Sequence, residues 1–346
     1  MVEIFRTPVR AEFPPVRPGL DADRIYADYD GGGPIVALSR TTGTEVWRYE
    51  RPFGGPKNVS VHAGRVLFAG SNAIALDAES GRELWRFDPG GIAGLGVTAA
   101  HADGFYFGTD RFIFGLSVQD GSLLWRTEIG PGWQYRGIVR GVSVSGDTVY
   151  ANVEQYLAEN GHLAVGHIFA LDRRTGAVLW KFTEGNGTDR HWFMNQPVVA
   201  GGWILLSDFE KNVYVALDRI TGEARWRTPG DPDRYFGALD PPKVSGDTVY
   251  TSSADRWVTA MDLRTGAVFW KTRLMASVDG IALCGSRILA HDGGLYVLDR
   301  GTGKLLKSIV EDTPGYSTLM ISKFASDGRH AYVLGNRFVY GYRCPE

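Results

Sequence analysis

Two stretches of the chain collect side chains that bind anions, move protons and stack on flat ligands. They are EIGPGWQYRGIVRG, residues 128–141, and TEGNGTDRHWFMNQP, residues 183–197. We predict His191, Tyr135 and Arg136 as catalytic candidates. In this prediction His191 or Tyr135 acts as acid or base, and Arg136 binds an anionic group. Side chains of these and neighbouring loops would complete a ligand site: Lys57, Trp133, Arg140, Arg190, Trp192, Asn195, Tyr235 and Tyr316.

Each of these residues also has a purely structural interpretation. Long loops carry mixed polar side chains, and pairs such as Asp189–Arg190 brace them, so bracing is the commoner role of any single residue. The cluster as a whole favours a binding site, because pockets gather aromatic side chains and a few polar groups. The sequence has no GxSxG or HExxH motif, so serine-hydrolase and zinc-protease chemistry gain no support.

A few further residues are weaker candidates for catalysis or metal binding. Asp208, Asp255 and Asp292 stand at equivalent places in successive parts of the chain, and each could serve as a base. Aspartate is a common turn former, so we favour the turn at all three places. His162 and His167 stand five apart without a third partner, which favours a solvated loop over a metal site. We predict no bound metal.

The elements that position these loops come from one repeated motif. VALDRITGEARW, residues 215–226, has close copies at residues 73–85, 168–180 and 258–270. Each copy reads as a strand, a polar turn ending in glycine, and a second strand ending in tryptophan, which predicts a β-hairpin. Two further strand-like runs stand before each hairpin. The repeating unit is therefore four short antiparallel strands.

The number of units predicts the fold class. Six tryptophan copies, a seventh with Lys307 in the tryptophan place and a truncated eighth at residues 337–343 indicate an all-β, eight-bladed propeller. We expect residues 1–346 to form one domain. Residues 3–8 place Phe5 in the tryptophan position, so this N-terminal strand should complete the blade of residues 314–343 and close the sheet edges. The tryptophans should dock successive blades: Trp47, Trp85, Trp125, Trp180, Trp226 and Trp270.

A propeller of this kind carries two sets of loops on one face. These are the connections between blades and the middle turn of each blade, and we call this side the loop face. The TG turns of the motif lie on the opposite face. Functional residues are expected on the loop face, because binding groups usually stand on loops held by a rigid frame. The surplus length of the fourth blade, EQYLAENGHLAVGH at residues 154–167, should project there as an insertion.

Composition limits the classes of partner and the compartment. The net charge is −2, with 37 basic and 39 acidic side chains, so we predict no nucleic-acid partner. No segment is apolar enough to span a bilayer, so no membrane partner is expected. The first residues lack the apolar core of a signal peptide, which predicts a cytoplasmic chain, or an exported one if Met1 replaces a removed leader. Two unrelated thiols are favoured over one disulfide for Cys284 and Cys344, and a monomer is expected.

The ALDxxTGxxxW pattern resembles the tryptophan-docking repeat of the quinoprotein (PQQ) dehydrogenases and of non-enzymatic relatives of the BamB type. The resemblance covers nearly the whole chain and implies the propeller fold. The dehydrogenases carry a vicinal cysteine pair beside the quinone, and carboxylate and amide ligands for calcium. Cys284 and Cys344 are far apart and no calcium-loop pattern occurs, so we predict no cofactor. BamB-like proteins are exported lipoproteins that hold partner proteins, which implies a partner-holding role.

Three functions are consistent with these patterns. The first is a binding scaffold that holds a protein partner or a small ligand on the loop face around blades three to five. The second is a cofactor-independent enzyme of the lyase, cyclase or isomerase type, with a pocket at the mouth of the channel. The third is a PQQ-dependent dehydrogenase. A concave pocket shared by His191 and an arginine would favour the enzyme, whereas side chains spread over a flat rim would favour the scaffold.

Overall fold

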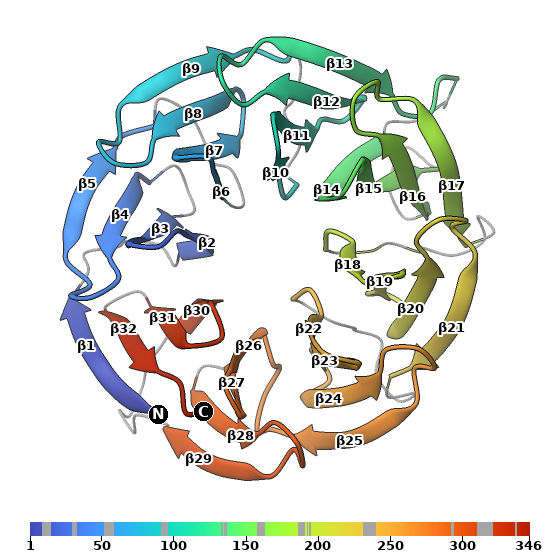
Figure 1. Cartoon of the computed structure of the whole chain (residues 1–346). Helices are drawn as coiled ribbons and strands as arrows, with labels where there is room; N and C mark the ends of the chain where they lie inside the picture. Colours follow the sequence, from blue (N-terminus) through green and yellow to red (C-terminus); the bar gives the residue numbers. More distant parts are fainter. Residues whose placement is uncertain are drawn as a thin grey trace. The chain divides into compact units, whose positions relative to one another are not determined.

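The structure is a computed structural model in which all regular elements are β-strands. It describes residues 1–8, 15–29, 33–51, 59–90, 96–132, 134, 137–157, 163–185, 191, 193, 195–230, 240–291, 294–309, 321–335 and 338–346. Within these ranges, 32 strands form eight four-stranded antiparallel sheets. The fold is therefore the all-β, eight-bladed propeller that the repeat predicts, and this prediction is confirmed (Figure 1).

The chain divides into two compact units, each with its own four blades. Unit 2 comprises Ser60–Gly237. Its blades, numbered 2 to 5, are β6 (Ser60–His62), β7 (Arg65–Ala69), β8 (Ala73–Asp77) and β9 (Glu83–Phe87); β10 (Ala99–His101), β11 (Gly104–Gly108), β12 (Phe112–Ser117) and β13 (Leu123–Glu128); β14 (Gly137–Ser145), β15 (Thr148–Tyr156), β16 (Ala164–Asp172) and β17 (Val178–Glu184); and β18 (Val198–Ala200), β19 (Trp203–Asp208), β20 (Val213–Asp218) and β21 (Ala224–Pro229).

Unit 1 comprises Met1–Val59 and Ala238–Glu346. Its blades 1, 6 and 7 and its closing blade are β2 (Pro15–Leu20), β3 (Arg24–Tyr29), β4 (Ile35–Ser39) and β5 (Glu45–Tyr49); β22 (Lys243–Ser245), β23 (Thr248–Ser252), β24 (Trp257–Asp262) and β25 (Val268–Arg273); β26 (Gly280–Cys284), β27 (Arg287–His291), β28 (Leu295–Asp299) and β29 (Leu305–Ile309); and β30 (Ile321–Ser326), β31 (His330–Gly335), β32 (Phe338–Arg343) and β1 (Val2–Pro8).

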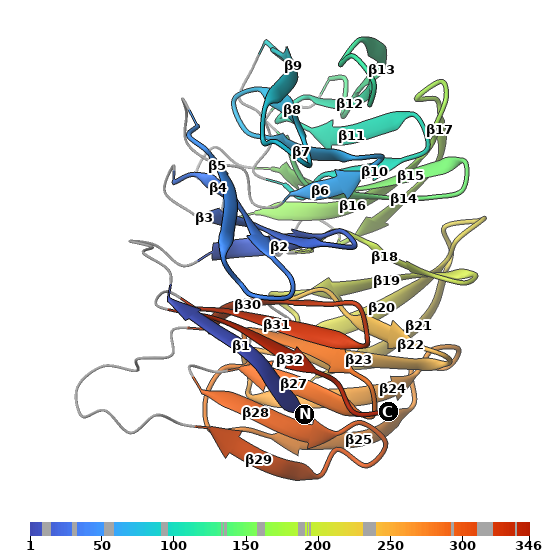
Figure 2. The same cartoon turned by 60° about the vertical axis from the view of Figure 1, so that its left-hand side comes forward.

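The two ends of the chain share the closing blade. Strand β1 pairs antiparallel with β32, with Phe5 opposite Gly341 and Arg6 opposite Tyr340, and Figure 2 shows the two strands side by side. The predicted closure by the N-terminal strand is confirmed. This blade was expected to begin at residue 314, but residues 314–320 lie outside the described part of the chain, and β30 begins at Ile321.

A disulfide joins the closing blade to blade 7. Cys284 at the end of β26 and Cys344 after β32 are bonded, with their Cα atoms 4.9 Å apart. The prediction of two unrelated thiols is therefore wrong. The error has a physical reason: the cysteines are 60 residues apart in sequence, and only the docking of the chain end against blade 7 brings them together.

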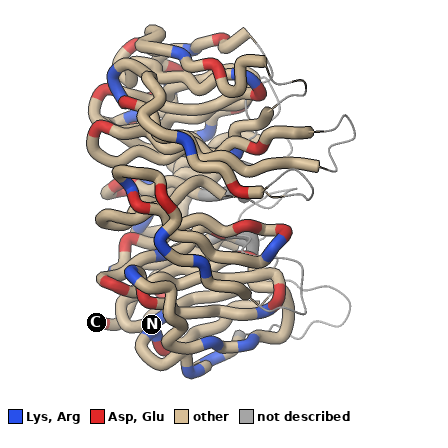
Figure 3. Tube along the Cα trace, turned by 90° about the vertical axis from the view of Figure 1, so that its right-hand side faces the viewer, with Lys and Arg blue, Asp and Glu red and all other residues tan. Residues whose placement is uncertain are grey.

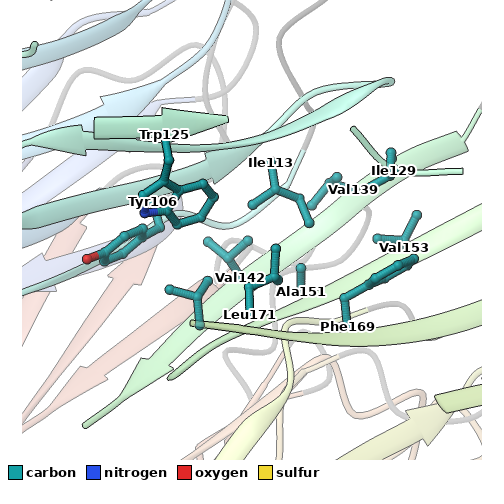
Figure 4. Packing of buried hydrophobic residues seen from close by; sticks show 11 residues of the cluster. Tyr106, Ile113, Trp125, Ile129, Val139, Val142, Ala151, Val153, Phe169 and Leu171 are labelled. Carbon is teal, nitrogen blue, oxygen red and sulfur yellow. The ribbon is translucent and has the colours of Figure 1, made fainter. Parts of the chain in front are cut away.

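The repeated tryptophan docks one blade on the next. In unit 2 the indole N–H of Trp85 donates to the carbonyl of Val118 at 2.9 Å, and that of Trp125 to the carbonyl of Arg173 at 2.8 Å. A Cβ on Gly121 would lie 2.6 Å from the Trp85 ring. The glycine of this motif turn therefore combines a positive φ of 72° with the close approach that the indole requires. Figure 4 shows Trp125 packed with Tyr106 and the aliphatic side chains of blades 3 and 4.

The aspartate of the motif closes the turn of the same hairpin. In blade 4, Asp172 accepts hydrogen bonds from the backbone N–H and the hydroxyl of Thr175, both at 2.8 Å. These bonds hold the pKa of the Asp172 carboxyl below its usual value. Asp262 and Asp299 make the same pair of contacts to Thr265 and Thr302. The motif therefore encodes both the turn and the blade contact.

The charged residues do not separate into large blocks of one sign. Blue and red segments are interspersed along the trace in Figure 3, in keeping with the net charge of −2. The part of the chain that the structure describes contains no helix suited to crossing a bilayer.

Candidate functional site

The candidate site lies on the loop face of blades 4 and 5, in unit 2. Blade 4 has the longest strands of this unit, and the extra residues extend the β15–β16 hairpin, with Tyr156 opposite Ala164. The surplus length was expected to form a projecting insertion. Half of it, residues 154–156 and 164–167, continues β15 and β16, and residues 158–162 lie outside the described part of the chain. The hairpin thereby provides a rigid wall for the connection between blades 4 and 5.

The described part of that connection is fixed to blade 4 by hydrogen bonds. The amide nitrogen of the Asn152 side chain, which is fully buried, donates to the carbonyls of Phe193, at 2.5 Å, and Asn195, at 2.7 Å. The backbone N–H of His191 donates to the carbonyl of Ala164 at 2.9 Å. A buried amide that satisfies two carbonyls holds the chain in one path, because either carbonyl alone would be left unpaired without it.

Phe193 anchors the same connection in the core. Its ring is 1% exposed and packs in the cluster of Tyr150, Ile168 and Ile204. A Cβ on Gly166 would lie 3.0 Å from this ring, so the glycine in β16 makes room for it. Segment 191–196 therefore combines a hydrophobic anchor with polar pins at its described residues. We call this segment, with Asn152, the pinned connection.

His191 and Asp208 form a hydrogen-bonded pair. The Nδ1 atom of His191 lies 2.7 Å from Oδ2 of Asp208 at the end of β19, and their side chains are 16% and 2% exposed. Asp208 also accepts a bond from the backbone N–H of Lys211 at 3.2 Å, so it forms the turn as well. Gly185, with φ of 97°, lies beneath the imidazole, where a Cβ would meet the ring at 2.7 Å. The carboxylate orients the ring and leaves Nε2 as the outward nitrogen.

Burial shifts the pKa values of Asp208 and of His167, which lies in β16. Burial raises the pKa of the Asp208 carboxyl, and the hydrogen bond from His191 opposes that shift. Burial, with a smaller contribution from Lys181, lowers the pKa of His167 to about 3. The His167 nitrogens lie 2.9 Å from Thr183 Oγ1 and 2.9 Å from Gln155 Oε1. His167 was expected in a solvated loop, and it is instead a neutral, buried histidine of β16.

Arg140 points to a carboxylate of its own blade. Its Nε donates to Glu154 at 2.8 Å, a second guanidinium nitrogen also contacts Glu154, and Tyr156 lies 3.4 Å away. Glu154 is fully buried, and an unpaired carboxylate there would be costly, so the contact with Arg140 stabilises blade 4. A ligand-binding role for Arg140 stays a prediction, and Glu154 competes with any incoming anion for the guanidinium.

The predicted site residues divide into two groups. His191, Arg140 and Asn195 are described, and all three belong to the blade 4–5 region of unit 2. The others lie outside the described residues: Lys57, Trp133, Tyr135, Arg136, Arg190, Trp192, Tyr235 and Tyr316. Their roles, and the catalytic role of His191, stay predictions. Among the described residues no group of three or more His, Cys, Asp or Glu side chains is arranged to hold a metal ion.

Asn152, Glu154 and the pairing of Asp208 with His191 were not predicted. One sequence signal could have indicated the first of these. The fifth residue of the second strand is small in blades 2 and 3, Ala69 and Gly108, but polar and buried in the next four blades: Asn152, Ser207, Ser252 and His291. A polar residue at a core position of a repeat needs a partner. In blade 4 that partner is the connection after β17, which Asn152 holds through two hydrogen bonds.

The repeat, the docked tryptophans and the eight four-stranded blades define a PQQ-repeat β-propeller. A family profile described as "Outer membrane protein assembly factor BamB" matches residues 7–162 and 164–327. The chain therefore belongs to the BamB family of these propellers.

Individual relatives share about a quarter of their aligned residues with this chain. Tetrathionate hydrolase of Acidithiobacillus ferrooxidans is 23% identical over 297 residues, which are 72% of this chain and 58% of that protein. The outer membrane protein assembly factor BamB of Shewanella oneidensis is 26% identical over 259 residues, 66% of this chain and 59% of that protein. The chain thus spans less than two thirds of these relatives. The crystal structure of BamB from Moraxella catarrhalis shares the fold, with a TM-score of 0.73, 18% identity and 99% of both chains covered.

This chain lacks the vicinal cysteine pair that the resemblance to the quinoprotein dehydrogenases leads us to expect beside a quinone. The resemblance implies two adjacent cysteines beside the quinone. Here Cys284 and Cys344 are bonded to each other across 60 residues of sequence, from β26 to the chain end. The residues present therefore do not match that part of a quinone site, and no step through the cofactor is derived.

Proposed function

We propose that this chain is a binding scaffold that holds a partner protein on the loop face around blades 3 to 5. The observation that carries the proposal is the pinned connection. Its described residues are fixed to blade 4 by the Asn152 amide and by Phe193, so a partner would meet a surface that is already ordered. A preformed surface binds with less ordering cost. Membership of the BamB family supports a partner-holding role.

The pairing of Arg140 with Glu154 also supports a scaffold over a catalyst. Arg140 is engaged with Glu154, within its own blade, and this carboxylate competes with an anionic substrate for the guanidinium. The disulfide between Cys284 and Cys344 supports work in an oxidising compartment, since such bonds persist there and are rare in the cytosol. We therefore propose that the scaffold acts after export, in place of the cytoplasmic location expected from the first residues.

The proposal is tested by removing the pin. Asn152→Ala deletes both hydrogen bonds to the connection and leaves the loop carbonyls of Phe193 and Asn195 without their donor. Thr175→Ala, in the exposed TG turn of the same blade, is the matched control. Both variants and the wild type are produced in cells, lightly crosslinked and purified, and co-purifying proteins are quantified by mass spectrometry. The proposal requires a partner that Asn152→Ala loses and Thr175→Ala keeps. Equal recovery with both variants would refute it, provided both unfold at the same temperature as the wild type.

The second candidate is a cofactor-independent enzyme, and the His191–Asp208 pair favours it. A carboxylate on Nδ1 holds the ring so that Nε2 can accept a proton, which is the arrangement of a general base. The relative named tetrathionate hydrolase suggests tetrathionate as the probe. This candidate predicts turnover of tetrathionate by the wild type and its loss in His191→Ala. Turnover that persists in His191→Ala, or none in the wild type, would exclude this reaction at His191.

A further inference from the structure

A cavity of about 700 Å³ is lined by residues of unit 1, whereas the candidate site belongs to unit 2. It is lined by the first strands of four blades, β22, β26, β30 and β2, and by turns at their ends. Its volume is in the range that holds a small organic ligand. The wall combines polar and apolar side chains, and the apolar lining includes Pro18, Leu20, Ile281, Leu283 and Phe324.

Two cations line the cavity, and their partners differ. Lys243 is paired with Asp240, Nζ to Oδ2, at 2.9 Å. Arg300, which follows Asp299 in the turn between β28 and β29, donates to the hydroxyl of Ser245 at 3.3 Å. Within the described residues Arg300 has no carboxylate partner. Asp299, the residue before it, pairs with Arg287, and Asp247, two residues after Ser245, pairs with Arg264.

The same motif position shows what a structural arginine does here. Arg40 follows Ser39 in blade 1 and pairs with Asp327, and Arg173 follows Asp172 in blade 4 and pairs with Asp103 and Asp147. Those arginines hold blades together through carboxylates. Arg219 and Arg300, at the same position in blades 5 and 7, each contact a serine hydroxyl instead, and Arg300 also lines the cavity. A cation that lines a cavity and has no carboxylate partner is suited to bind an anion.

We propose that this cavity is a binding site for a small anionic ligand with an apolar body. A carboxylate or sulfonate would pair with the guanidinium of Arg300, and the apolar part would lie along Leu20, Leu283 and Phe324. The hydroxyl of Ser245, which accepts from Arg300, lines the same cavity and would donate a hydrogen bond to the head group. This site is separate from the proposed protein-binding face, since all its lining residues belong to unit 1.

The test uses two fluorescent probes that differ in one group. 8-Anilinonaphthalene-1-sulfonate carries the anion, and N-phenyl-1-naphthylamine has the same apolar body without it. The proposal predicts saturable binding of the sulfonate, weakened about tenfold in Arg300→Gln, because a charged hydrogen-bonded pair is lost. Binding of the neutral probe should change less than about twofold in that variant. Arg219→Gln is the matched control, since Arg219 contacts Ser145 in unit 2 at 3.3 Å, as Arg300 contacts Ser245.

A second variant separates binding from folding. Ser245→Asp supplies Arg300 with the carboxylate that Arg40 and Arg173 have, so it should preserve or raise stability and still weaken the sulfonate about tenfold. The proposal is overturned if the wild type shows no saturable sulfonate binding. It is also overturned if Ser245→Asp binds the sulfonate as the wild type does, or if Arg219→Gln weakens it as much as Arg300→Gln.

Discussion

The ring of Phe5 occupies the space that a side chain on Gly43 would need. A Cβ on Gly43 would lie 2.4 Å from the Phe5 ring, and Gly43 has a φ of 70°. The same relation joins Trp85 to Gly121, Trp125 to Gly176 and Trp270 to Gly303. Phe5 therefore does for the closing blade and blade 1 what the tryptophans do for the other blades.

Loss of the Phe5 ring should weaken the packing of the closing blade against blade 1. Phe5→Ala is expected to destabilise the protein by about 2–4 kcal/mol, at the lower end for Phe→Ala because Phe5 is only partly buried. Phe5→Trp restores the residue type of the other copies and should cost under about 1.5 kcal/mol. Urea unfolding measures both. Equal losses for the two variants would show that the ring does not dock as a tryptophan does.

The glycine of the motif turn must adopt a positive φ and must leave space for the indole. The free-energy costs of violating these two requirements can be measured separately. Gly64, in the turn between β6 and β7, has a φ of 70° and open space within 4 Å of the position that a Cβ would take. Gly121, in the turn between β12 and β13, has a φ of 72°, and a Cβ there would meet Trp85 at 2.6 Å. Gly64→Ala should therefore cost only the backbone contribution, about 1–2 kcal/mol. Gly121→Ala should cost about 1–3 kcal/mol more, because the methyl group displaces the indole. A thermal melt of each variant tests this, and equal costs would contradict the steric part.

The disulfide should stabilise the end of the chain. Cys284 and Cys344 enclose a segment with a sequence separation of 60, so reduction is expected to lower the free energy of unfolding by about 2–4 kcal/mol. The double variant Cys284→Ser/Cys344→Ser should lose the same amount and no longer respond to reductant. Labelling of two free thiols in unreduced protein would contradict the bond.

His167 should make stability fall with acid. Its pKa is about 3 in the folded protein against 6.5 when unperturbed, so protons bind the unfolded chain first. The contribution of His167 is complete above pH 6.5 and is lost as pH falls toward 3. His167→Gln should therefore reduce the slope of unfolding free energy against pH by about 1.4 kcal/mol per pH unit in this window. Urea unfolding at pH 7, 5 and 4 gives the slopes, and unchanged slopes would contradict the burial of the ring.

The blades could be predicted from the sequence because their causes are local. The Asp–Thr–Gly turn and the docked tryptophan recur within single copies, and Phe5 could be recognised from the residues around it. The site depends on contacts between copies. Asp208 was interpreted as a turn former, and its bond to His191 arises only where the end of β19 meets the connection after β17. Likewise, Arg140 was predicted to bind a ligand from the residues around it, and its partner Glu154 lies on the next strand, β15.

The most direct test of the account is to locate the partner contact on one blade. A photo-crosslinking amino acid replaces Gln196 on the loop face, or Thr221 in the exposed TG turn of blade 5, and cells producing each variant are irradiated. The account predicts one defined crosslinked protein from position 196 and none from position 221. Crosslinking from position 221 alone, or equally from both, would contradict the assignment of the loop face as the binding surface.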